Sequence, residues 1–406
     1  MAIQTAAAAA GARALSDSIR TRYIEDYENA AAMERIYDQI AEPIAADMSR
    51  YARGNLIQIP FISDMQPGTT AISEVVDITP QVLEDAVTTI TPTSRAEALQ
   101  ASELLLMQAY TDYGAERFRA VAKGSMESIE ILARDVATKG DLVIRPAGTR
   151  GTLDAGSTGH RAADGIFTEA TTLLNTMKCP GFDLDGGGQA WVAIMHPAVF
   201  HDLRTDGNVV NVGVYQKEGL ILNFELGSLG PFRLVVSAWA KVFGAAGVAN
   251  TNPIDTTLAC QGTALDKTIT VASSTHMDNL QQYFTIGTAE SGSTHYPMNE
   301  IVRYVRHTSK VAHIVGEASD GGLRFTHASG AAVSNTDNVF TVVFGGPRSL
   351  AKVYQPSVGP FGTVVGPKLD GIVDQFVTLG NKFYGAYGIV AQNRILRAEV
   401  SSSVQA

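Results

Sequence analysis

The chain is 406 residues long, with 45% hydrophobic residues, 18% charged residues and a formal net charge of −10. This length supplies two or three hydrophobic cores, and the composition is that of a globular protein rather than a disordered one. The negative charge argues against a chain whose main task is gripping nucleic acid, because neutralising phosphates requires clustered Lys and Arg. The low charged fraction suits a subunit that buries much of its surface against neighbours.

Cysteine content and hydropathy indicate the compartment. Cys179 and Cys260 are the only cysteines, which fits a reducing cytoplasm and provides neither a disulfide framework nor a zinc-binding spacing. The first ten residues lack the basic start and the Leu-rich core of a signal peptide. No stretch approaches the roughly 18 strongly apolar residues of a membrane-spanning helix. We therefore expect synthesis and assembly in the cytoplasm, with no membrane partner.

Residues 1–53 are predicted to form a polar, helix-rich arm. Its apolar residues are intermittent and include Tyr23, Tyr27 and Tyr37, so the arm cannot bury itself well alone. Pro43 marks its end, since proline cannot continue a helix. A solvated helical hairpin packed on its own chain is the alternative.

Residues 54–96 are predicted to form a long β-hairpin. Strand-forming runs at 55–62 and 82–93 flank a polar tip rich in turn residues. This tip, which is too polar for a core, contains Met65, Pro67 and Glu74.

Residues 97–150 contain the clearest helix pattern, at 114–138. Apolar residues recur there at i, i+3 and i+4, and the pairs Lys123–Glu127 and Glu130–Arg134 are expected on the opposite side. At 1.5 Å per residue this helix would run about 37 Å. Its spacing alone also fits a long core helix of another α/β protein.

Residues 151–248 are predicted to hold a second helix near 168–178 and a strand at 190–195 that ends at His196-Pro197. A His before Pro at a strand-to-helix junction is interpreted as a turn and capping residue. The run of glycines at 186–188 precedes a strand and lacks a following Lys-Ser/Thr pair, which excludes a phosphate-binding loop.

No catalytic, cofactor-binding or metal site is predicted. The chain has no Gly-x-Ser-x-Gly and no His-Glu-x-x-His motif. Asp183 and Asp185 lie in a Gly-rich stretch where turns explain them. His196 and His201 lack a third ligand at a familiar spacing.

Residues 249–345 are predicted to form a small all-β insertion. Short alternating runs recur here among Thr, Ser, Asn, His and Gly, at 268–272, 282–287, 301–307, 310–316, 323–327 and 339–344. The histidines in this stretch are irregularly spaced, which favours scattered strand residues and leaves a metal site as the alternative.

Two blocks of sequence resemble the major capsid proteins of tailed double-stranded DNA bacteriophages, in particular the short-tailed phage family with the Hong Kong 97-type fold. One block follows His196-Pro197 and the other is the closing strand after Phe376. The residues that carry the resemblance are His196, Pro197, Glu225, Gly227, Gly230, Arg233, Gly380, Lys382, Tyr384, Gly385, Asn393 and Arg397.

The resemblance implies an α+β fold in six parts. They are an N-terminal arm (1–53), an extended hairpin loop (54–96), a peripheral domain with a spine helix (97–150), the first part of a central domain (151–248), the all-β insertion (249–345) and return strands (346–406). It also implies contacts between subunits, for which we expect Tyr23, Tyr27, Tyr37, Met65, Pro67, Glu74, Arg117, Glu127 and Arg134.

The function implied by the resemblance is self-assembly into an icosahedral virion shell of pentamers and hexamers around double-stranded DNA, without sequence-specific DNA binding. A separate scaffolding protein and a portal protein are the implied partners, with a decoration protein as an option. The hairpin contains no Lys, which rules out a lysine-to-asparagine crosslink from this loop. The alternatives are a β-rich surface-binding protein and a cellular nanocompartment shell of the same fold.

Overall fold

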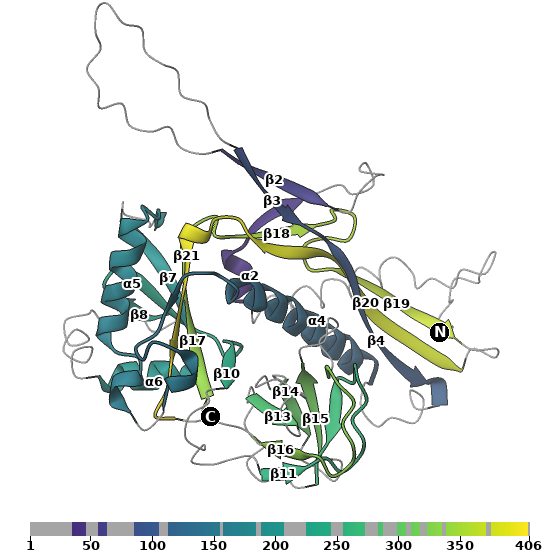
Figure 1. Cartoon of the computed structure of the whole chain (residues 1–406). Coiled ribbons are helices and arrows are strands. Elements are labelled where there is room, and N and C mark those ends of the chain that lie inside the picture. The colour runs from purple at the N-terminus through teal and green to yellow at the C-terminus, as the bar shows by residue number, and fades with distance from the viewer. Residues whose placement is uncertain are drawn as a thin grey trace, which may run out of the picture. The chain divides into compact units, whose positions relative to one another are not determined.

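The computed structural model describes residues 35–45, 56–62, 85–104, 113–154, 157–183, 188–206, 225–244, 255–272, 283–286, 299–305, 310–316, 323–334, 338–370 and 375–404. The chain divides into two compact units, each built from separate stretches of sequence (Figure 1). The first comprises Met1–Val136 and Leu350–Val390, and the second comprises Ala137–Ser349 and Ala391–Ala406.

The first unit is built on a five-stranded sheet. Its strands run in the order β1-β18-β20-β19, and β4 pairs with β20 as well. All pairs are antiparallel except β1 with β18. The bounds are β1 Glu42–Ala45, β4 Thr93–Ser102, β18 Leu350–Tyr354, β19 Thr363–Asp370 and β20 Phe376–Ile389.

The long helix α4 (Tyr113–Ala137) packs on one face of this sheet. Because side chains alternate along a strand, Leu379 and Asn381 of β20 lie on the same face. Leu379 packs against Phe118 and Val121 of α4, and the Asn381 amide donates a hydrogen bond to the Ser125 hydroxyl. The helix predicted at 114–138 is therefore confirmed.

The predicted hairpin is present at its base as a separate two-stranded sheet. Strand β2 (Ile57–Ile62) pairs in antiparallel register with β3 (Asp85–Ile90), and both pack near Ala351 and Val353 of β18. The tip, residues 63–84, lies outside the described residues. The single return strand expected at 82–93 is wrong in its extent: Pro92, which lacks an N–H group, separates β3 from β4.

The second unit contains an eight-stranded sheet in the order β5-β21-β17-β7-β9-β8, with β10 paired to β17 and β6 to β7. Its helices α5 and α6 join the core, where Phe167, Phe232 and Phe344 meet ring to ring. The bounds are β5 Val143–Ile144, α5 Asp164–Thr176, β6 Phe182–Asp183, β7 Gln189–Met195, α6 Pro197–Thr205, β8 Glu225–Leu229, β9 Phe232–Val236, β10 Val242–Gly244, β17 Asn338–Gly345 and β21 Ile395–Val400. Three short 3-10 turns are η3 Arg150–Thr152, η4 Thr158–His160 and η5 Gln392–Arg394.

A six-stranded sheet in the same unit has its own apolar core, which includes Leu258, Phe284 and Ile314. The strand order is β11-β16-β13-β14-β15-β12. The bounds are β11 Asp255–Thr257, β12 Thr268–Thr270, β13 Tyr283–Ile286, β14 Asn299–Val305, β15 Val311–Val315 and β16 Ala332–Ser334.

Two strands expected in the insertion are placed differently. The run at 339–344 is β17, buried at every position inside the eight-stranded sheet, because a run apolar on both faces suits a central strand. The run at 323–327 forms only an isolated bridge, between His327 and Gly262. Within the described part of the chain, no helix combines the length and apolar character needed to cross a membrane.

Candidate functional site

A buried group of charges fixes residues 35–45, the described part of the predicted N-terminal arm, to the rest of the first unit. It consists of Arg35, Asp38, Glu130, Lys352 and Tyr387, and is called here the α2 cluster because Asp38 lies in the short helix α2 (Tyr37–Ile40). The Glu130 carboxylate accepts hydrogen bonds from the backbone N–H groups of residues 36, 37 and 38, at 3.0, 2.8 and 3.3 Å. These bonds join α2 to α4.

Asp38 is the centre of the same cluster. Its carboxylate accepts bonds from Lys352 Nζ and from the Tyr387 hydroxyl, each at 2.5 Å, and from Arg35 at 3.1 Å. The Arg35 guanidinium also lies over the Phe361 ring, 3.7 Å from its centre. Segment 35–45 is thus held to β18 and β20 by charge-assisted hydrogen bonds, and to the loop before β19 by a cation–π contact.

Burial shifts the ionisation of this cluster. Removal from water raises the pKa of Glu130, although its three backbone hydrogen bonds act in the opposite direction. Burial lowers the pKa of Lys352 against the attraction of Asp38, and burial with the nearby Asp38 charge raises the pKa of Tyr387 well above its ordinary value. Tyr387 therefore stays neutral, and its hydroxyl donates a hydrogen bond to the Asp38 carboxylate.

Strand β4 is an exposed edge strand of the five-stranded sheet. Residues 93–100 are all exposed, and within the described residues its single partner strand is β20. Leu99 on this strand is 41% exposed. A strand with one neighbour presents unpaired backbone N–H and C=O groups along its other edge, so β4 can accept a further strand.

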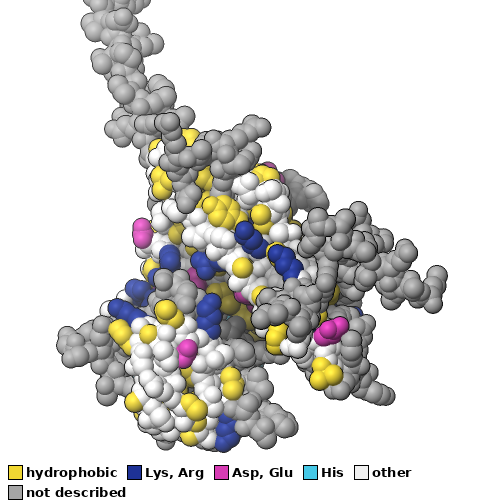
Figure 2. Space-filling model, turned by 90° about the vertical axis from the view of Figure 1, so that its right-hand side faces the viewer, with side chains coloured by type: hydrophobic (Ala, Val, Ile, Leu, Met, Phe, Trp, Pro, Cys, Tyr) yellow, Lys and Arg dark blue, Asp and Glu magenta, His cyan; other side chains and the backbone are white. Residues whose placement is uncertain are grey.

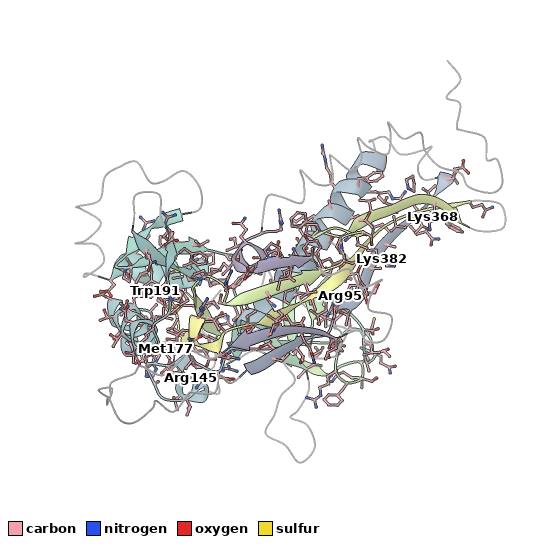
Figure 3. The ribbon with its side chains drawn as sticks, turned by 90° about the horizontal axis from the view of Figure 1, so that it is seen from above. Arg95, Arg145, Met177, Trp191, Lys368 and Lys382 are labelled. Carbon is pink, nitrogen blue, oxygen red and sulfur yellow. The ribbon has the colours of Figure 1, made fainter. Side chains whose placement is uncertain are left out.

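The sheet also carries basic side chains. Lys382 of β20 and Lys368 of β19 are exposed and share the face opposite α4, since Lys368 pairs with Thr378 and side chains alternate. Figure 3 shows both lysines and Arg95 spread along this sheet. Lys and Arg are frequent, and Asp and Glu sparse, on the molecular face in Figure 2.

A second charge cluster, called here the Glu399 cluster, lies in the second unit. Glu399 of β21 is 0% exposed and accepts bonds from Arg145 Nε at 2.7 Å and from Arg150 Nε and Nη2 at 3.0 and 2.6 Å. Arg397 Nε lies 3.0 Å from the same carboxylate. Burial raises the pKa of Glu399, but the bonds from Arg150 and Arg145 outweigh it and leave the pKa lowered.

The structure assigns local roles to several residues that carry the sequence resemblance. His196 Nδ1 accepts a bond from the Ala198 N–H at 3.1 Å and caps α6, as predicted. Gly230 turns the β8–β9 hairpin with a φ of +59°, which favours glycine. A Cβ at Gly380 would come within 2.7 Å of the Glu97 carbonyl oxygen, so the pairing of β20 with β4 depends on this glycine. Residues at the remaining positions are placed as follows: Pro197 begins α6, Glu225 and Gly227 lie in β8, Arg233 in β9, Lys382, Tyr384 and Gly385 in β20, Asn393 in η5 and Arg397 in β21.

The residues expected to contact other subunits divide into three groups. Tyr23, Tyr27, Met65, Pro67 and Glu74 lie outside the described residues. Tyr37, Arg117 and Arg134 are buried within the subunit and pack against its own residues rather than facing a neighbour. Glu127 keeps partial exposure and pairs with Lys123 at 3.8 Å, as predicted.

The exposed ion pair predicted between Glu130 and Arg134 is wrong, because both side chains are buried. Glu130 binds the backbone of α2, and Arg134 binds Asp135 at 3.0 Å.

Asp38, Lys352 and Tyr387 carry no signal in the sequence as a group, and neither do the members of the Glu399 cluster, because these residues are far apart in the chain. Among the described residues, no three His, Cys, Asp or Glu side chains gather as metal ligands would.

Comparison with solved structures identifies the fold. The chain is similar to the capsid subunit of Ralstonia phage GP4, with a TM-score of 0.57 and 8% identity over 93% of this chain and 91% of that one. It is also similar to the capsids of cyanophage P-SCSP1u (TM-score 0.52, 10% identity, 91% and 89% covered) and cyanophage Pam1 (TM-score 0.50, 12% identity, 99% and 98% covered). No protein-family model and no curated protein sequence matches the chain. The chain therefore has the α+β, Hong Kong 97-type fold of tailed-phage capsid proteins.

Proposed function

We propose that this chain is a major capsid protein that self-assembles into an icosahedral shell of pentamers and hexamers enclosing phage double-stranded DNA. The observation that carries the proposal is strand β4, which is exposed from 93 to 100 and has one partner strand among the described residues. In a chain with a capsid fold, an exposed strand edge of this kind favours pairing with a neighbouring subunit.

The free edge of β4 favours addition of a strand from a second copy. Its unpaired backbone groups bond to water in the free subunit, and a neighbouring strand would satisfy them while covering Leu99. Many moderate contacts of this kind, repeated around each subunit, give a stable shell in which single contacts remain correctable.

The arm and the hairpin tip are the proposed reaching elements. The residues proposed to touch neighbouring subunits are Tyr23, Tyr27, Met65, Pro67, Glu74 and Glu127. The α2 cluster supports this role, because it fixes the arm at 35–45 and leaves Tyr23 and Tyr27 in the part of the arm that precedes this anchor.

The six-stranded sheet is the proposed insertion domain. Asp255 of β11 pairs with Ser334 of β16, so the stretch 255–334 enters and leaves at adjacent positions. A separate core and adjacent ends favour an added module that contacts capsomer neighbours or a decoration protein. We propose a separate scaffolding protein and a portal protein as assembly partners, and a structural rather than enzymatic role in the virion, built in the host cytoplasm.

Assembly by a variant of the β4 edge tests the proposal. The purified protein, expressed with and without a candidate scaffolding protein, is imaged by negative-stain electron microscopy. We expect wild-type shells or capsomer rings, and none from Leu99→Lys. Leu173→Lys is the matched control, because Leu173 of α5 is 36% exposed and belongs neither to the β4 edge nor to the proposed insertion domain.

The proposal fails if the wild-type chain stays a monodisperse monomer under every condition. Shells of Leu99→Lys at wild-type yield would contradict the role of the β4 edge. Protection of double-stranded DNA against nuclease in particles from infected cells separates a virion shell from a nanocompartment.

A further inference from the structure

The Glu399 cluster has an imbalance of charge. One buried carboxylate faces three guanidinium groups, those of Arg145, Arg150 and Arg397. The like charges of Arg150 and Arg145 contribute, after burial, to lowering the pKa of Arg397. A further anion beside this cluster would therefore relieve repulsion among the arginines.

The two outer arginines keep the means to bind an anion. The Arg145 and Arg150 side chains are 27% and 31% exposed. Arg145 uses only Nε toward Glu399, so its two Nη groups have no hydrogen-bond acceptor within the described residues. Arg150 uses Nε and Nη2 and keeps Nη1. A guanidinium offers its donors as a planar fork, which matches a carboxylate.

The cluster holds these donors in place. Glu399 fixes Arg145 and Arg150 through its two oxygens, and the Arg150 guanidinium lies over the Phe243 ring at 3.8 Å. Side chains ordered in this way lose little further freedom on binding. An exposed lysine such as Lys139 has no such support.

The sequence of the chain itself offers the complementary charge. The stretch 54–94 is the longest in the chain without Lys or Arg, and it carries Asp64, Glu74, Asp77, Glu84 and Asp85. Carboxylates with no compensating base nearby are favourable partners for an arginine pair. The net charge of −10 for the whole chain disfavours DNA phosphate as the occupant, because the DNA would also meet acidic surface.

We infer that Arg145 and Arg150 form a carboxylate-binding site that takes an acidic side chain from the hairpin segment 63–84 of a second copy of this chain. This inference rests on the proposed function and names one contact within it. The site makes each subunit a receiver of its neighbour's hairpin at a position separate from the β4 edge.

Peptide binding tests the site without requiring assembly. The probe is a fluorescent peptide of residues 63–84, titrated by anisotropy into the full-length Leu99→Lys protein, which is expected to stay a monomer. Arg145→Gln in this background should weaken binding about tenfold, as should a peptide whose Asp and Glu are changed to Asn and Gln. Lys139→Gln is the matched control and should bind as tightly as its parent.

A second variant distinguishes loss of the binding site from misfolding of the protein. Arg145→Lys keeps the positive charge but not the fork, so several-fold weaker binding is expected from a protein with an unchanged circular dichroism spectrum. No peptide binding, or equal binding by Arg145→Gln, overturns the inference. A DNA duplex of about 20 base pairs that binds the parent in preference to the peptide, and loses affinity in Arg145→Gln, overturns it in favour of phosphate.

Shell formation by the wild type tests the proposed capsid function separately from the carboxylate-binding site. Wild-type shells together with no Arg145-dependent peptide binding would remove this inference and leave the proposed function standing. Absence of wild-type shells would instead remove the proposed function, whatever the peptide does.

Discussion

Glu130 in the first unit and Glu399 in the second are both carboxylates that the fold removes from water, yet their neighbours differ. Glu130 is held by backbone N–H groups, and the α2 cluster contains two acids, Glu130 and Asp38, and two bases, Arg35 and Lys352. Glu399 is one acid among three arginines. A balanced buried cluster fits a purely structural task, whereas an unbalanced one at a partly exposed site fits binding of a further charge.

Removing one member of the balanced cluster should give the largest effect. Lys352→Met leaves the buried Asp38 carboxylate without its ammonium partner, and we expect the free energy of unfolding to fall by about 3–5 kcal/mol. Chemical denaturation measures this change. Lys368→Met, on an exposed position of the same sheet, is the control and should change stability by less than about 0.5 kcal/mol.

The pH dependence of stability should differ in sign between the two carboxylates. The folded-state pKa of Glu130 is raised above 4.5, so the folded state binds its proton first as the pH falls, and the wild type should gain stability relative to Glu130→Gln between pH 7 and 4.5. The folded-state pKa of Glu399 is lowered below 4.5. Its contribution should hold down to about pH 4.5 and be lost below it, so the advantage of the wild type over Glu399→Gln should shrink there.

Thermal or urea unfolding of the wild type and both variants across this pH range gives the comparison. Parallel pH profiles for the two pairs of proteins would show that the two environments do not differ as described.

The cap of α6 tests a smaller contribution in the second unit. His196→Ala removes the acceptor of the Ala198 N–H, and we expect a loss of about 1–2 kcal/mol in the free energy of unfolding. His196→Asn should recover part of it, because Asn is a strong N-cap residue. His201→Ala, at an exposed position of the same helix, should be nearly neutral, and an equal loss from it would contradict the capping role.

Removal of the six-stranded sheet is expected to have the smallest effect on the folding of the rest of the chain. Because Asp255 and Ser334 are paired neighbours, a short Gly/Ser bridge can replace 255–334 without stretching the chain. The remaining protein should fold with β17 still paired with β7 and β21, which circular dichroism and a cooperative thermal unfolding transition would show. Insoluble or unfolded protein would show that this module is part of the fold itself.

The sequence could predict what depends on local pattern. The period of α4 and the His196-Pro197 junction were identified because helix spacing and capping act between residues a few positions apart. The base of the hairpin was located for the same reason, through two β-rich runs. The closing strand was identified through its glycines and tyrosines.

The charge clusters could not be predicted in this way. The sequence pattern predicts that Glu130 is a surface member of an i, i+4 pair. Glu130 is buried only because residues 36–38, which lie more than ninety positions earlier, approach it. Strand β17 reads like the short strands before it, and only its place between β7 and β21 shows which sheet it joins. Such contacts between distant segments leave no periodic signal in the sequence.

Hydrogen exchange of the backbone amides in free subunits and in assembled shells is the most direct test of the central claim that the β4 edge is an assembly surface. We predict that assembly slows exchange within 93–102 and leaves exchange within α5, residues 164–176, nearly unchanged. Exchange within 93–102 that is equally fast in shells and in free subunits would contradict the claim, because the edge would then remain open to water in the assembled particle.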